Sequence, residues 1–126
     1  MKELLNANLY SLNQLEDVLQ KIDNDDYQRK LPVLSGSSIG MHFRHVLEFY
    51  DLLLQCGDQL CYDDRPRRYA IENNTAEALG FLQNLKMALK SIEIDRPLML
   101  SAGYDAHSDV KTEVKSTFSR ELAYNL

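Results

Sequence analysis

The composition of this 126-residue chain sets the first limits on its function. Its length is enough for one domain with a single hydrophobic core. A net charge of −5 and a pI near 5.1 argue against nucleic acid or an anionic membrane as its main partner. No signal peptide is recognisable, and no apolar run approaches the roughly 20 residues of a membrane span. We therefore expect a cytoplasmic protein with its two cysteines reduced.

The first predicted helix covers residues 3 to 22, where leucine and isoleucine recur at helical spacing. The acidic run from Asp23 to Asp26 ends it. A connection through Leu31, Pro32 and a Ser-Gly-Ser-Ser run then leads to the central helix.

The central helix is predicted from Ser37 to Cys56, because a serine can cap its first turn and Gly57 follows its last. Most of its apolar residues fall on one broad side, which we expect to pack against neighbours. The residues expected on the opposite side are Arg44, Glu48, Asp51 and Gln55.

Two histidines lie inside the apolar side, His42 near its centre and His45 near its edge. An ionisable group on a buried face must be neutral, hydrogen-bonded or bound to a ligand. The two imidazoles are thus interpreted as satisfied interior histidines, as metal ligands or as general acid–base groups. The other metal-binding candidates, His107, Cys56 and Cys61, form neither a CxxC nor an HxxxH motif, so spacing alone is a weak indication of metal.

The stretch CYDDRPRRY after Gly57 is irregular, and its Pro66 suits the first turn of the next helix. A cluster of charged residues in this region has two interpretations. In the first, the cluster orients an anionic ligand at the mouth of a bundle. In the second, its members form ion pairs that fasten the crossover loop. The group consists of Asp63, Arg65, Arg67 and Glu72.

The third predicted helix has a heptad-like apolar seam from Ile71 to Ile92 and ends before Pro97. The period then changes to two. Alternation at Leu98 and Leu100, and again at Val110, Thr112 and Val114, predicts a short hairpin. Ser116 and Thr117 then open a further helix with the sequence FSRELAYNL.

Three segments in order along the chain resemble the DinB/YfiT-like family. SSIGMHFRHVLEFYDLLL resembles the signature of the family's second helix, and YDDRPRRYAIE is similar to the segment that opens its third. STFSRELAYNL resembles the entry to its fourth helix. The nearest likeness is to a bacterial, uncharacterised DinB-like branch.

The resemblance implies an all-α fold, a helical bundle of the up-down-down-up type with a long crossover after its second helix. We expect three long helices, the start of a fourth, and a short β-hairpin between the third and fourth. Residues 1–126 would form a single domain, C-terminally incomplete because the fourth helix has only begun at Leu126.

The resemblance also implies a divalent metal, zinc or nickel, held by three histidines. The second-helix ligand corresponds to His45, with His42 as the alternative, whereas the later HxxxH-type pair has no counterpart in this sequence. A family acidic position is occupied by Arg68. We therefore expect weak or absent metal binding by the chain itself.

Two functions from different classes remain open. The first is that of a DinB-like metal-binding protein, which in complete form is a metal-dependent hydrolase or a thiol transferase acting on a small molecule. The alternative is a non-catalytic helical bundle or fragment whose histidines are structural. Because the apolar seams need a partner along their length, a homodimer that buries an exposed groove is expected in either case.

Overall fold

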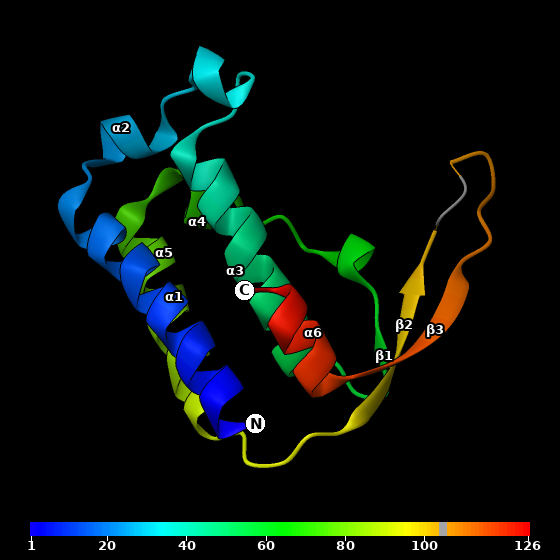
Figure 1. The fold of residues 1–126 in the computed structure, drawn as a ribbon. Helices are drawn as coiled ribbons and strands as arrows, with labels where there is room; N and C mark the ends of the chain where they lie inside the picture. Colours follow the sequence, from blue (N-terminus) through cyan, green and yellow to red (C-terminus); the bar gives the residue numbers. More distant parts are fainter. Residues whose placement is uncertain (104–105) are drawn as a thin grey trace.

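The computed structural model describes residues 1–103 and 106–126 and shows a helical bundle with a small sheet at one side (Figure 1). Residues 104–105, in the predicted hairpin loop, lie outside the described part. The helices are α1 Lys2–Lys21, α2 Asn24–Gln28, α3 Ile39–Gln55, α4 Tyr69–Asn73, α5 Thr75–Lys90 and α6 Phe118–Tyr124, with 3-10 turns at Pro32–Leu34 and Tyr62–Asp64. The strands are β1 Gln59–Leu60, β2 Pro97–Ala102 and β3 Thr112–Thr117.

The predicted all-α class is wrong, because three strands form a mixed sheet in the order β1-β2-β3. The predicted hairpin is present as the antiparallel pair of β2 and β3, although the second strand begins at Thr112 rather than Val110. β1 pairs parallel to β2 and has only two residues, too few to show a pattern in the sequence. Its position depends on tertiary contacts, including a hydrogen bond of 2.7 Å from the Met99 amide to the Asp58 carbonyl.

The expected set of three long helices plus the start of a fourth is also wrong. The described chain has six α-helices, and two short ones, α2 and α4, were not predicted as separate elements. The third helix divides at Asn74, whose backbone is extended at φ −141° and ψ 116°. Its side chain accepts from the amides of Ala76 and Glu77, and it therefore starts α5 as a separate helix. In the same way the carboxylate of Asp23 caps α2.

The positions of α1, α3 and α6 agree with the sequence predictions to within two residues. In each case the reason is local. Ser38 accepts the Met41 amide at the start of α3, and Thr117 accepts the Arg120 amide at the start of α6.

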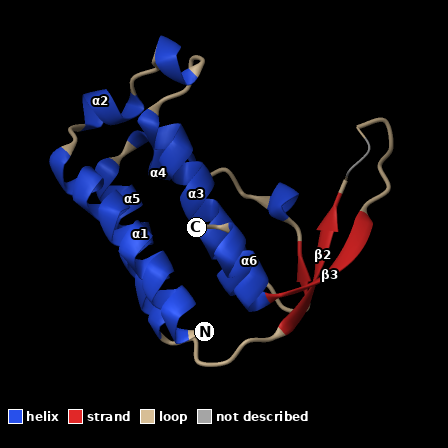
Figure 2. Cartoon of the chain, viewed as in Figure 1, coloured by secondary structure: helices blue, strands red, loops and turns tan. Residues whose placement is uncertain are grey.

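The core lies between α1, α3 and α5, and it is closed at one end by α6. α5 packs against both α1 and α3, whereas the seven-residue α6 accompanies them over a short part of their length. The sheet lies beside α3 on the side away from α1 (Figure 2). The large aromatic and leucine side chains that are fully buried are Tyr27, Tyr50, Phe118, Leu12, Leu47, Leu53, Leu60, Leu82, Leu89 and Leu122.

Within the described residues, none of the helices combines the length and the apolar character that a membrane crossing requires.

Candidate functional site

The faces of α3 differ from those that the periodicity predicts. His42 and His45 are exposed, whereas Glu48, expected on the opposite side, is completely buried. The cause is tertiary, because α4 and the residue before it pack on the charged side of α3, where Glu72 pairs with Arg44 and Arg68 covers Glu48. The expectation that the two histidines lie on a buried face is therefore wrong.

The buried charges form a network that holds the crossover segment against α3. Arg44 Nη1 lies 2.6 Å from Glu72 Oε2, and its Nε lies 3.5 Å from Glu48 Oε1. The backbone amide of Arg68 donates to Glu48 Oε2 at 3.0 Å, and its guanidinium reaches Asp51 at 3.2 Å. A fastening network thus exists, as one interpretation of the sequence held.

Its members differ from the predicted group, of which only Glu72 takes part. Arg67 is exposed with a φ of 52°, and Asp63 lines a cleft elsewhere. Arg65 contacts His45 instead.

Rings from α3, from the crossover between α3 and α4, and from α6 form a row that begins at His45. The rings of His45 and Phe49 are 4.4 Å apart at their centroids, and Phe49 stacks on Tyr62 at 4.5 Å. Tyr124 of α6 follows at 6.3 Å from Tyr62. The Arg65 guanidinium lies over the Phe49 ring, 5.2 Å from its centroid. Residues from α3, the crossover and α6 thus meet at one place.

The contact between Arg65 Nη1 and His45 Nδ1 determines what His45 can do. A guanidinium has only donors, so Nδ1 must accept, and the neutral ring then carries its proton on Nε2. Partial desolvation, and then the charges of Arg65, His42 and Arg44, lower the pKa of His45. His45 is therefore a neutral hydrogen-bond donor through Nε2.

A cleft of about 330 Å³ opens beside this imidazole, and we call it the His45 cleft. It is lined by His45, Val46, Phe49, Tyr124 and Asn125. Both polar atoms of the Asn125 side chain are buried, and neither makes a hydrogen bond of ordinary length and angle among the described residues, although the side chain lies near enough to the Tyr62 hydroxyl to act on its pKa. Unpartnered buried amides are uncommon, and a ligand or water usually explains them. Sequence reasoning missed Asn125, because nothing in its neighbourhood marks it.

A second cleft, of about 360 Å³, lies on the other side of Tyr62 between the sheet and α6. Here the buried carboxylate of Glu121 accepts from Tyr62 at 3.0 Å and from Ser116 at 2.6 Å. Burial, and then the nearby Glu121 charge, raise the pKa of Tyr62, so its phenol stays protonated. Tyr62 and Glu121, the buried polar groups at this cleft, thus satisfy each other, which favours a structural role for the pair.

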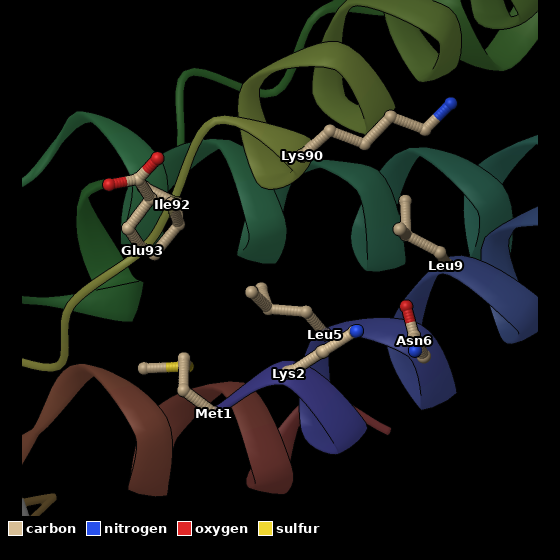
Figure 3. Close-up of a pocket in the computed structure, with 8 residues that line it drawn as sticks. All are labelled: Met1, Lys2, Leu5, Asn6, Leu9, Lys90, Ile92 and Glu93. Carbon is tan, nitrogen blue, oxygen red and sulfur yellow. The ribbon is translucent and has the colours of Figure 1, made fainter.

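A third cavity, of about 350 Å³, lies where the start of α1 meets the end of α5. Figure 3 shows Met1 and Leu5 toward its middle, while the amine of Lys90 points away from them. Its polar groups do not converge, so the cavity carries no evident chemistry.

The residues proposed as metal ligands are not brought together. Among the described residues, no three His, Cys, Asp or Glu side chains are grouped so that they could hold a metal ion. Cys56 donates to the Leu53 carbonyl at the end of α3, and Cys61 lies 3.2 Å from Lys111 Nζ. His107 is exposed in the loop before β3. The described residues therefore do not by themselves fit a divalent metal.

No family model, no curated protein and no solved structure matches this chain. The DinB-like resemblance stays a prediction.

Proposed function

We propose that this chain is a DinB-like protein that binds a small molecule in the His45 cleft. The observation that carries the proposal is the meeting of a donating imidazole, two aromatic rings and the unpartnered Asn125 amide around one cleft. Small-molecule sites combine apolar and aromatic walls with a few converging polar groups in this way.

The same resemblance supplies the proposed reaction class, metal-assisted hydrolysis or thiol transfer. Because the described residues do not fit a metal, we assign no reaction step to one. The hydrogen bonding of the His45 imidazole is a further reason to expect weak metal binding. Metal-bound histidines usually donate their other N–H to a carbonyl or carboxylate. His45 instead accepts from a cation at Nδ1, which makes the ring a poorer ligand.

Mapping of bound fragments by NMR tests the proposal. Amide shifts from a mixed fragment set should concentrate at Val46, Phe49 and Asn125 and weaken in His45→Ala. His42→Ala is the matched control, because His42 is an exposed histidine one turn earlier that does not line the cleft. Shifts scattered over the surface, or insensitive to His45→Ala, would refute the site. Calorimetry with zinc or nickel should show at most weak binding. Tight one-to-one binding that is lost in His45→Ala would refute the expectation of weak metal binding.

The second candidate is a non-catalytic helical protein that self-associates as a two-fold dimer. It is favoured by the short span of α6, seven residues against twenty in α1. Apolar residues on α1 and α3, among them Leu15 and Val46, are only partly buried, and Val18 is exposed. Such surfaces commonly mark interfaces.

Light scattering at micromolar concentration tests this candidate. A dimer should dissociate in Val18→Lys but not in Met87→Lys, a control at an exposed position of α5. Leu85 and Leu89 of α5 are buried in the core, so charges there would test folding instead. A monomer at all concentrations would exclude the dimer.

A further inference from the structure

Arg65 differs from the other arginines on or beside α3. Arg44 and Arg68 are paired with carboxylates, and Arg96 donates to the carbonyls of Gly57 and Cys56 at 2.6 and 2.8 Å. No ion pair among the described residues includes Arg65. Its partners are a neutral ring nitrogen and the face of Phe49, and its Nε is buried without a hydrogen-bond partner.

A half-buried guanidinium without a counter-ion is unfavourable, because burial removes water that would otherwise solvate the charge. The charge also lies directly behind a donor. Arg65 accounts for one side of the His45 ring, and the Nε2–H is left to donate on the other. A ligand oxygen that accepts from Nε2 would thus feel the Arg65 charge through the imidazole.

We propose that the His45 cleft binds a molecule with an anionic oxygen group, which accepts from His45 Nε2–H and serves as counter-ion to Arg65. The inference rests on the proposed function and adds the charge of the ligand. The apolar body of the molecule packs against Phe49 and Tyr124, which also line the cleft.

The surrounding charges permit an anion. Arg44 adds positive charge near His45, and Glu48 opposes it. Glu48, however, is already compensated by Arg44 and by the Arg68 amide. Glu121 lies behind the Tyr62 ring, and both of its oxygens accept hydrogen bonds.

Three probes test the inference by NMR titration of the whole chain: benzoate, its neutral analogue benzamide, and inorganic phosphate. Benzoate should shift the amides of Val46, Phe49 and Asn125 saturably and bind about tenfold more tightly than benzamide, as expected for a charge-assisted hydrogen bond. Phosphate that competes with benzoate would identify the anionic oxygens as sufficient. Phosphate that does not compete would show that the aromatic body is also required.

Variants at Arg65 identify the source of the preference. Arg65→Gln should bind benzoate and benzamide equally, whereas Arg65→Lys, which keeps the charge, should retain part of the preference. Arg67→Gln is the matched control, since Arg67 is exposed on the same loop and should leave the preference unchanged.

The outcomes separate the two proposals. Equal binding of benzoate and benzamide to the unmodified protein, or a preference that survives Arg65→Gln, would overturn the anion inference and leave the cleft as a binding site. No shift at the cleft with any of the three probes would overturn the anion inference, and fragment mapping that also avoids the cleft would overturn the proposed function.

Discussion

Replacement of Gly40 by alanine should strongly destabilise the protein, although alanine is the better helix former. Gly40 lies in the first turn of α3, where α4 and the ring of Tyr27 approach its backbone. A Cβ at this position would stand 2.0 Å from the Glu72 carbonyl oxygen and 2.9 Å from Tyr27 Cε1. Neither neighbour is the free end of a flexible side chain, so backbone must move.

The size of the effect follows from these contacts. Ordinary contact begins at 3.4 Å, so α4 must withdraw by about 1.4 Å. That movement stretches the buried hydrogen bond from Tyr27 Oη to the Ile71 carbonyl, now 2.7 Å, and the pair of Arg44 with Glu72. Overpacking together with the weakened hydrogen bond should cost at least about 3 kcal/mol, more than the roughly 1 kcal/mol gained in helix propensity.

Urea unfolding followed by circular dichroism measures the difference. Gly80→Ala is the matched control, because Gly80 is also helical and a Cβ there meets nothing within 4 Å. It should stabilise the protein by up to about 1 kcal/mol. If Gly40→Ala unfolds within about 1 kcal/mol of the unmodified protein while Gly80→Ala behaves as expected, the close approach of α4 to α3 is refuted.

Three further predictions concern buried or capping groups. Burial raises the pKa of Tyr50 from 10.0 to about 12, so stability present below pH 10 should fall as the pH rises toward 12. The loss of stability is up to about 2.7 kcal/mol, and Tyr50→Phe should flatten this part of the pH–stability curve. An unchanged slope in the variant would contradict the prediction. Asn74→Ala should lower stability by about 1 kcal/mol in thermal unfolding, because it removes the N-cap of α5. If the variant is as stable as the unmodified protein, Asn74 has no capping role. Glu48→Gln should lower the free energy of unfolding in urea by about 2–3 kcal/mol, because it removes the negative charge that compensates Arg44. The control Asp63→Asn, at an exposed position, should change stability little. Equal losses of stability in the two variants would argue against the buried network.

The elements that were predicted correctly are those with a local cause. Leucines at helical spacing determine α1, and Ser38 and Thr117 mark the starts of α3 and α6. The change to a period of two locates the hairpin strands. Each of these signals lies within a few residues of the element that it specifies.

The site depended on contacts that join distant parts of the chain. His45 lies on a predicted helix, but its neutral, donating state depends on Arg65, twenty residues later in an irregular loop. Glu48 looked solvent-facing because no local pattern shows that Arg68 will cover it. Asn125 acquires its place in the cleft only when α6 packs against α3.

By itself, the sequence of this protein determined the positions of α1 and α3 and the presence of the hairpin, because hydrophobic spacing and capping act between neighbours in the chain. Only the tertiary structure decided which side of α3 is buried, that β1 joins the sheet in parallel, and which charge stands behind His45. Those features depend on the partner that each residue meets after the chain has folded, and residue spacing carries no information about that partner.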